Sequence, residues 1–282
     1  MTKIKTFITH KMAETMADCQ DSYAVHAANR AVAVADGVSQ SLFPKAWADL
    51  LTRSFVGDRT FRLDSPAKVE AVRREWWQYF AGRVEHMRRE NAPALWYLEG
   101  CLADGRSAGS TLAGVRVKNA GAVAYEVLGD TCLILVRGGC IERQISSMPD
   151  GAGFGNCPDY VDSHAEAGMR GTPRTGTLDM RPGDRLFLAT DALAARFDAE
   201  RAGADRGKQF IATVNALETD RDFALFVDGL RKEGAADDDT TLVCIEWERA
   251  TRFRVAGEKP AAGHDRKKNR KKKKHYGTNR KR

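Results

Sequence analysis

Residues 31–37 read Ala-Val-Ala-Val-Ala-Asp-Gly, and this stretch decides the fold class. A short apolar run with no polar alternation predicts a strand that is covered on both faces. The run ends abruptly at Asp36-Gly37, so a carboxylate follows directly where the buried strand stops. Such a strand is typical of a layered domain in which sheets lie between other elements.

Strand and helix patterns surround this stretch on both sides. Runs rich in β-branched and apolar residues predict further strands at 3–9, 22–28, 110–117, 122–128, 131–137, 140–145, 185–190 and 241–247. Apolar residues at helical spacing predict helices over 43–55, 66–91 and 208–232, the last broken near Asp220, and another from Ala192. We therefore expect one α/β domain over residues 1–250, with layered antiparallel sheets and helices outside.

Segments with a less regular pattern give three further expectations. Residues 146–175 are rich in Gly, Pro and Asp, so we expect a long irregular loop there. In the helix over 66–91, Arg73 and the other charged residues are expected on the solvated face. Aromatic residues in and after this helix are expected to pack helices rather than to stack on nucleic-acid bases. They are Trp76, Trp77, Trp96 and Tyr97.

The charge of the chain is concentrated at one end. The 282 residues include 45 Lys and Arg against 38 Asp and Glu, which gives a net charge of +7 and a pI near 9.1. Residues 257–282 hold 12 of the basic and 2 of the acidic residues, so the other 256 residues hold 33 and 36, a net of −3. We expect 257–282 to be a disordered polybasic tail. Its candidate partners are nucleic acid, an anionic membrane or an acidic protein, against a merely solubilising role.

Several classes of protein are disfavoured by what the sequence lacks. No run approaches the roughly 18 consecutive apolar residues of a membrane-spanning helix, and the N-terminus lacks the apolar core of a signal peptide. The six cysteines include no Cys-x-x-Cys pair and no zinc-finger spacing, so we interpret them as reduced thiols. These features predict a cytoplasmic location without a transmembrane segment.

Aspartates stand at the ends of several predicted strands. They are Asp21, Asp36, Asp130, Asp191 and the run Asp237–Asp239. Each alone is typical of a turn residue that caps backbone amides. If these carboxylates meet in space, they repel one another unless protons or cations neutralise them. Hard oxygen ligands in this number suit Mg²⁺ or Mn²⁺ rather than zinc, so we expect a divalent-cation site.

The words around these aspartates resemble the motifs of a known family. They are Cys19-Gln20-Asp21-Ser22-Tyr23-Ala24-Val25, Val34-Ala35-Asp36-Gly37, Gly109-Ser110-Thr111, Leu128-Gly129-Asp130-Thr131, Leu188-Ala189-Thr190-Asp191 and Asp238-Asp239-Thr240-Thr241-Leu242-Val243. In order, and over Thr9 to Trp247, they are similar to the motifs of the metal-dependent protein phosphatases, the type 2C Ser/Thr phosphatases, and most of all to a bacterial branch. The resemblance implies a four-layer α-β-β-α sandwich of two antiparallel sheets flanked by helices.

The resemblance also implies a centre of two Mn²⁺ or Mg²⁺ ions between the sheets. Asp36 is expected to bridge both ions, and the carbonyl of Gly37 to bind one of them. Asp191 and one of the final aspartates are expected to hold the other ion. The motif spacing favours Asp238 for this role, with Asp237 as the alternative.

The activity that the resemblance implies is metal-dependent hydrolysis of phosphoserine or phosphothreonine in proteins. Asp36 and Asp21 are the expected catalytic carboxylates, and Asp21 is expected to act mostly through metal-bound water. Two ions lower the pKa of a bridging water and neutralise the phosphoryl oxygens, so no catalytic cysteine is needed. The expected partner is a phosphoprotein, the target of a Ser/Thr kinase, and the expected state is a monomer.

Two positions near the expected centre depart from the family's pattern. Met16 stands where many members have an arginine that grips the substrate phosphate. Lys11, or His10 beside it, is the candidate substitute, because either can donate to a phosphate. Val38 replaces a histidine proposed as general acid, which leaves protonation of the leaving group to water or to another residue.

The third departure is Ala195, which replaces a carboxylate that helps to bind a third ion together with the position of Asp130. Asp130 is therefore either a weak third-site ligand or a turn residue. In the loop expected after the meander, Phe154, Tyr160 and Arg170 are candidates to touch the substrate. The departures leave an alternative open, namely a weak or dead phosphatase-fold module that binds a phosphoprotein or nucleic acid and is tethered by the basic tail.

Overall fold

The computed structural model describes residues 2–118, 121–149, 153–154, 158–164 and 168–248, and the backbone of 253–255. The polybasic tail expected at 257–282 lies outside the described residues, as does Cys157. The five described cysteines are free thiols, as expected. No helix in the described ranges has the length and apolar character needed to cross a lipid bilayer.

Most strands form two large sheets. One consists of β1 (Thr2–Thr9), β7 (Cys132–Arg137), β8 (Cys140–Ile145), β12 (Arg185–Ala189), β13 (Thr240–Glu246) and β14 (Phe253–Val255), in the order β14-β1-β13-β12-β7-β8. The other consists of β2 (Ser22–His26), β3 (Ala31–Ala35), β5 (Leu112–Val117), β6 (Ala122–Leu128) and β11 (Arg174–Asp179), in the order β11-β6-β5-β3-β2. Neighbouring strands in both sheets run antiparallel, apart from the parallel pair β1 and β14.

The two faces of β3 pack into two different cores. Val32 and Val34 lie in an apolar cluster that contains residues of both sheets, so this face looks into the space between the sheets. The three alanines of β3 lie in a second cluster, together with helical residues such as Trp47 and Leu51. Small side chains on this face let a helix pack closely against the strand. The strand is therefore covered on both faces, as its sequence predicts.

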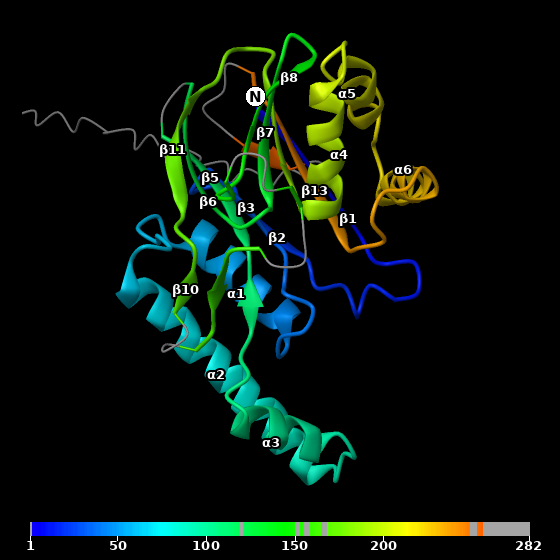
Figure 1. Cartoon of the computed structure of the whole chain (residues 1–282). Coiled ribbons are helices and arrows are strands. Elements are labelled where there is room, and N and C mark those ends of the chain that lie inside the picture. Colours follow the sequence, from blue (N-terminus) through cyan, green and yellow to red (C-terminus); the bar gives the residue numbers. More distant parts are fainter. Residues whose placement is uncertain are drawn as a thin grey trace, which may run out of the picture.

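Helices cover the outer face of each sheet (Figure 1). On the five-stranded side lie α1 (Pro44–Gly57), α2 (Pro66–Arg89) and α3 (Leu95–Ala103), and on the six-stranded side lie α4 (Asp191–Ala202), α5 (Lys208–Asn215) and α6 (Asp220–Lys232). The helix expected over 208–232 is broken before Asp220, where Thr219 caps α6 by accepting a hydrogen bond from the N–H of Asp222. The layers are helix, sheet, sheet and helix, which confirms the predicted fold class.

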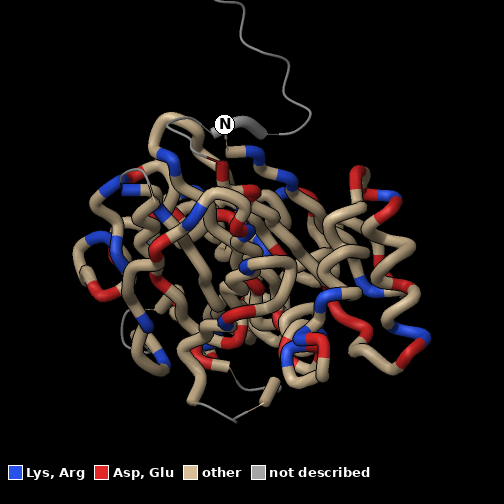
Figure 2. The backbone as a smooth tube through the Cα atoms, turned by 90° about the horizontal axis from the view of Figure 1, so that it is seen from above, with Lys and Arg blue, Asp and Glu red and all other residues tan. Residues whose placement is uncertain are grey.

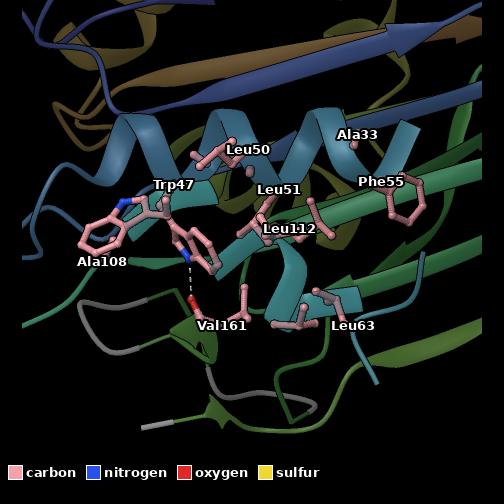
Figure 3. Packing of buried hydrophobic residues seen from close by; sticks show 14 of the residues in the cluster. Ala33, Trp47, Leu50, Leu51, Phe55, Leu63, Ala108, Leu112 and Val161 are labelled. Carbon is pink, nitrogen blue, oxygen red and sulfur yellow. Dashed lines mark hydrogen bonds between the residues drawn. The ribbon is translucent and has the colours of Figure 1, made fainter. Parts of the chain in front are cut away.

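Trp47 anchors the helical layer on the five-stranded side. Its side chain is fully buried, and its Nε1 donates a hydrogen bond to the carbonyl of Val161 at 2.8 Å (Figure 3). Trp76 of α2 is also fully buried in this cluster, and Trp77 packs against it, as expected for both. The indole N–H of Trp47 therefore ties α1 to a segment more than 100 residues further along the chain.

The region expected to be an irregular loop, 146–175, contains strands, so that prediction is wrong in part. β9 (Tyr160–Asp162) lies between β4 (Gly109–Ser110) and β10 (Met169–Arg170) in a small third sheet, and β11 begins before the expected loop ends. Strands of two or three residues are too short to show a periodic pattern. β11 is an edge strand with one buried side chain, Leu178, so it also lacks the alternation that marks a strand.

Two expectations about the helical region are wrong. Arg73 is buried rather than solvated, and it donates hydrogen bonds to the carbonyls of Asp162 and Gly168, both at 3.0 Å. These partners lie far away in the sequence, so the local helical pattern gives no sign of them. Trp96 and Tyr97 lie on α3, a helix that the sequence analysis does not predict. They do not pack, because 75% and 51% of their surfaces are exposed.

Charged residues are spread over the described body. Figure 2 shows Lys and Arg interspersed with Asp and Glu around the molecule, and in this view no side of the described chain carries one sign alone. Ion pairs such as Arg88–Glu99 join neighbouring surface groups. Exposed pairs of this kind contribute little to stability, about 0–1 kcal/mol each. The excess of basic residues therefore lies in 257–282 and not on the folded body.

Candidate active site

Five of the predicted aspartates come together where strands of the two large sheets begin or end. They are Asp21, Asp36, Asp130, Asp191 and Asp238. In the six-stranded sheet, β12 ends beside the start of β13, because Ala189 pairs with Leu242. In the five-stranded sheet, β2 starts beside the end of β3, because Ser22 pairs with Ala35. The antiparallel register thus gathers residues that precede one strand and follow another.

Burial and mutual repulsion raise the pKa values of these carboxylates. Burial raises the pKa of Asp36 well above its ordinary value, and the charges of the other four carboxylates raise it further. Burial is also the largest cause that raises the pKa of Asp21 to about 8, of Asp130 to about 7 and of Asp191 to about 6. At neutral pH the cluster therefore has to hold protons or cations.

Asp21 is fully buried at the junction of the two sheets. Its Oδ2 accepts a hydrogen bond from Thr190 Oγ1 at 2.9 Å, and Thr190 Oγ1 accepts one from the N–H of Thr241 at 2.9 Å. The buried Oδ1 atoms of Asp21 and Asp130 accept no hydrogen bond from the described residues. A buried carboxylate oxygen without a donor is costly. Both oxygens are therefore available to a cation, either directly or through a water bound to it.

The Gly-Ser-Thr motif at 109–111 fixes the main chain of Asp36. The carbonyl of Asp36 accepts hydrogen bonds from Ser110 Oγ at 2.8 Å and from the N–H of Thr111 at 2.9 Å. The N–H of Asp36 donates to Thr111 Oγ1 at 3.0 Å. These bonds give the motif a physical role, which is to hold the Asp36 backbone in place.

Gly37 occupies a position with no room for a side chain. A Cβ atom there would lie 2.8 Å from Pro44 Cβ and 3.0 Å from the carbonyl oxygen of Gln20. Its backbone also forms an isolated bridge with Ser110. Only glycine lets the chain pass this close to the start of α1, so the Asp36–Gly37 peptide is confined from both sides.

Two members of the run Asp237–Asp239 hold backbone amides, although the charge of Asp239 also raises the pKa values of Asp21 and Asp191. Asp237 is exposed, and its Oδ1 accepts a hydrogen bond from the N–H of Met12 at 3.0 Å. Asp239 is buried, and it accepts hydrogen bonds from the N–H groups of Lys11 at 3.2 Å and Gln20 at 2.8 Å. Both residues therefore shape the segment between β1 and β2.

Asp238 is the member of the run whose charge acts most widely on the cluster. It is half-buried, and its charge raises the pKa values of Asp36, Asp130 and Asp191. Its Oδ1 accepts a hydrogen bond from the N–H of Asp239 at 2.8 Å and lies 3.1 Å from the ammonium group of Lys11. Of the three, Asp238 is thus the best placed to share a cation with Asp191.

Lys11 lies at the cluster, whereas Met16 is exposed to solvent. The Nζ atom of Lys11 is 3.1 Å from Asp238 Oδ1 and 3.4 Å from Ser39 Oγ, and its side chain is only 19% exposed. Met16 is 48% exposed on the surface. His10 forms a hydrogen-bond contact of 2.7 Å between its Nδ1 atom and the Lys11 carbonyl. Ser39, in the loop after Asp36, is a neighbour that the sequence analysis does not identify.

Arg231 is a second residue that sequence reasoning does not find. Its side chain on α6 is 4% exposed, and Nη2 donates hydrogen bonds to the carbonyls of His10 at 2.9 Å and Asp238 at 2.8 Å. It also forms ion pairs with Asp228 at 3.1 Å and Asp237 at 3.2 Å. One buried guanidinium thus joins the end of β1 to the start of β13. No local pattern in the sequence marks this arginine apart from its neighbours on α6.

A cavity of about 400 Å³ opens beside Asp130. Phe154 lines it together with Arg174 and Arg201. Of the other two residues expected to touch substrate, Tyr160 packs its ring against Gly109, and Arg170 lies on β10 outside this lining. The lining of the cavity also includes Met148, Pro149 and other residues that follow β8.

The donor groups of the cluster are spread rather than closed around one point. Among the residues that the structure describes, no three His, Cys, Asp or Glu side chains are gathered closely enough to enclose one metal ion. Mg²⁺ commonly keeps several waters and takes only one or two protein carboxylates. An open arrangement of hard oxygen donors, two of them without a hydrogen bond, fits such an ion.

A comparison with models of protein families identifies the chain. The model described as "Protein phosphatase 2C" matches residues 11–232. The chain belongs to the protein phosphatase 2C family. The matched range includes Asp21, Asp36, Asp130 and Asp191, and it ends before Asp237. The resemblance drawn from the motifs is therefore confirmed, bacterial relatives included.

Solved structures of phosphatases share this fold. The photosystem II phosphatase PBCP matches with a TM-score of 0.58 and 14% identity, over 89% of this chain and 100% of that chain. The catalytic domain of the serine/threonine protein phosphatase PstP, in complex with two manganese ions, matches with a TM-score of 0.51 and 20% identity, over 87% and 97%. PppA of Pseudomonas aeruginosa, a regulatory component of T6SS, matches with a TM-score of 0.51 and 19% identity, over 86% and 96%. A search of curated protein sequences finds no match.

Proposed function

We propose that this member of the protein phosphatase 2C family hydrolyses phosphoserine and phosphothreonine in proteins with the help of Mn²⁺ or Mg²⁺. The observation that carries the proposal is the convergence of five aspartates from five separate segments, each beside a strand end. Two of them keep a buried oxygen that accepts no hydrogen bond from the described residues. A cluster of this kind, in this family, supports a cation site for phosphoryl chemistry.

The proposed ligands follow from the positions of these groups. Asp36 would help to hold both ions, since the charges of the other four carboxylates all act on it. The carbonyl of Gly37 would help to hold one ion, and Asp191 and Asp238 would help to hold the other. Asp21 acts through water, since its Oδ2 is already engaged by Thr190. When bound, the ions supply neutralisation of the phosphoryl charge and activation of a water.

Lys11 is the proposed ligand of the substrate phosphate. Its ammonium group lies at the cluster beside Asp238 and Ser39, where it can donate to a phosphoryl oxygen. Val38 offers no proton, so we assign protonation of the leaving group to water. Asp130 remains a candidate ligand of a weak third ion, because its Oδ1 accepts no hydrogen bond from the described residues.

The proposed setting of the enzyme follows from the family. A Ser/Thr phosphatase acts on phosphoproteins, so the partner that we propose is the target of a Ser/Thr kinase. We further propose a cytoplasmic monomer in which residues 257–282 hold the enzyme near an anionic partner. PstP, a relative of the same fold, is solved with two manganese ions, which supports Mn²⁺ as a cofactor here.

The proposal is tested by hydrolysis of a phosphothreonine peptide with and without Mn²⁺. We expect activity that depends on Mn²⁺ and that Asp36→Asn lowers by at least about 100-fold, in the range found when a group that stabilises a transition state is removed. Asp104→Asn, an exposed aspartate at the end of α3, is the matched control and should retain full activity. Equal hydrolysis by the wild type and Asp36→Asn would show that this cluster is not the catalytic centre.

A further inference from the structure

α2 and α3 form a hairpin that projects from the body of the molecule (Figure 1). Leu98 and Cys101 of α3 are buried in the helical cluster, so one face of α3 packs. The hairpin tip, residues 91–98, reads Asn-Ala-Pro-Ala-Leu-Trp-Tyr-Leu and contains no charged side chain. Eight successive uncharged residues at the end of a projecting element differ from the mixed charge of the described body (Figure 2).

The hairpin tip exposes two aromatic side chains. Trp96 is 75% exposed, more than any other large apolar side chain in the described ranges, and Tyr97 is 51% exposed. Their rings touch edge to face, with centroids 6.2 Å apart. Three other tryptophans, Trp47, Trp76 and Trp247, are buried. Exposed apolar groups that gather in one place mark an interaction surface.

The chemistry of the hairpin tip fits the headgroup region of a lipid bilayer. Tryptophan and tyrosine favour this region, because each ring has an apolar body and one polar group that can stay hydrated. A nucleic-acid surface demands Lys or Arg against its phosphates. The hairpin tip has neither, and the exposed Arg88 and Arg89 that precede it are balanced by Glu90 and Glu99. An apolar contact alone binds a membrane weakly, so a second, electrostatic signal is needed.

Residues 257–282 supply charge that complements an anionic membrane. They carry a net charge of +10, whereas the rest of the chain carries −3. The described chain ends in β14, which pairs with the first residues of β1. Twenty-six residues have a contour length of about 85–95 Å. The width of a compact domain of this size is roughly 45 Å, and the 24 residues of α2 add at most about 36 Å. An extended chain of this length can therefore bring basic residues to the surface that the hairpin tip contacts.

We propose that the hairpin tip inserts Trp96 and Tyr97 into the headgroup region of an anionic lipid bilayer, while residues 257–282 bind the lipid charges. The inference is independent of the proposed phosphatase activity, because the hairpin tip contains none of the carboxylates of the site. It assigns a membrane contact to Trp96 and Tyr97, which the helical core leaves exposed. It also gives the basic residues one defined class of partner.

Flotation with lipid vesicles tests the proposal on the full chain. We expect binding to phosphatidylcholine vesicles that contain 30% phosphatidylglycerol, and none to pure phosphatidylcholine. The double variant Trp96→Ser/Tyr97→Ser should weaken binding by about tenfold or more, which corresponds to about 1.4 kcal/mol. Leu225→Ser is the matched control, because Leu225 is 62% exposed on α6, and it should bind like the wild type.

Fluorescence quenching measures the insertion of Trp96 into the bilayer independently. Brominated acyl chains quench a tryptophan only at short range, so vesicle-bound wild type should be quenched and Trp96→Phe should not. The proposal is overturned if the double variant binds like the wild type while deletion of 257–282 abolishes binding. It is equally overturned if no vesicle binds, or if Trp96→Ser/Tyr97→Ser only converts a dimer into a monomer. Loss of DNA binding in the double variant without an effect on vesicles would also reject it.

Discussion

Asp21 and Asp130 hold their protons to higher pH in the folded chain than in the unfolded chain. Burial raises the pKa of Asp21 to about 8 and that of Asp130 to about 7, from an ordinary value of 3.8. A carboxylate whose pKa is raised by folding adds most stability below its unfolded pKa, and this contribution is lost as the pH rises through the folded value. In EDTA we therefore expect the Tm to fall between about pH 4 and pH 8. Scanning fluorimetry at constant ionic strength measures this, and a Tm that rises across the window would contradict it.

A divalent cation should reverse this loss. Cations replace protons between carboxylates, and a ligand that binds only the folded state raises its stability. We expect Mn²⁺ to raise the Tm by several degrees at pH 8 and by much less at pH 5, since about 1 kcal/mol moves the Tm of a domain of this size by about 2–4 °C. Asp36→Asn should remove most of the difference. An equal effect of Mn²⁺ at both pH values would place its binding outside this cluster.

Gly37→Ala should damage both stability and activity. The added Cβ would lie 2.8 Å from Pro44 Cβ and 2.9 Å from the Pro44 backbone, so the chain after Asp36 has to shift. Overpacking of this kind costs about 1–3 kcal/mol. Gly57→Ala is the control, because nothing lies within 4 Å of its Cβ position, and it should leave both properties unchanged. Urea unfolding and peptide hydrolysis measure the two effects. Full activity of Gly37→Ala would show that this peptide tolerates movement.

Arg231 makes α6 a support of the candidate site. Its replacement by Met leaves the carbonyls of His10 and Asp238 without their donor, at a cost of about 1–3 kcal/mol. Since Asp238 is a proposed ligand, we also expect the Mn²⁺ concentration for half-maximal activity to rise several-fold. Arg221→Met, an exposed arginine on the same helix, should behave like the wild type. A loss of stability with an unchanged Mn²⁺ requirement would limit Arg231 to a purely structural role.

The sequence predicts the regular elements because their patterns are local. The Ala-Val alternation of β3 becomes two packed faces, and the break before α6 coincides with a capping threonine. The small sheet around β9 escapes prediction, because its strands have two or three residues and are held by distant partners such as Trp47 and Arg73. The helix α3 also escapes prediction, because it has only 9 residues and its exposed aromatic residues resemble core residues.

The candidate site is also predicted only in part, because local patterns are visible in the sequence and long-range contacts are not. Aspartates beside strand ends are visible in a sequence, and the antiparallel register brings five of them together. Asp237 and Asp239, in contrast, accept hydrogen bonds from backbone amides of a segment more than 200 residues away. The same holds for Arg231, whose carbonyl partner at His10 is 221 residues distant. Contacts of this kind follow from the fold and cannot be read from a local sequence motif.

At the scale of the whole molecule, we expect a folded body and a charged extension with separate tasks. Residues up to 255 include every strand that the structure describes, whereas 257–282 have a net charge of +10 and few apolar side chains. We therefore expect deletion of 257–282 to change the free energy of unfolding by less than about 0.5 kcal/mol. Hydrolysis of a small phosphate ester should also be unchanged. Urea unfolding and an assay with p-nitrophenyl phosphate measure both, and a large loss of either would show that the extension belongs to the folded unit.

The hydrogen bond from Thr190 to Asp21 crosses from one large sheet to the other. Asp21 precedes β2, whereas Thr190 follows β12, so neither sheet alone contains a complete site. The affinity of the proposed site for a cation should consequently depend on how tightly the two large sheets pack against each other. A mutation that only loosens the apolar interior between the sheets should lower cation affinity from a distance, and a bound cation should slow amide exchange in both halves together. The proposed centre, when it holds cations, would thus link the two sheets.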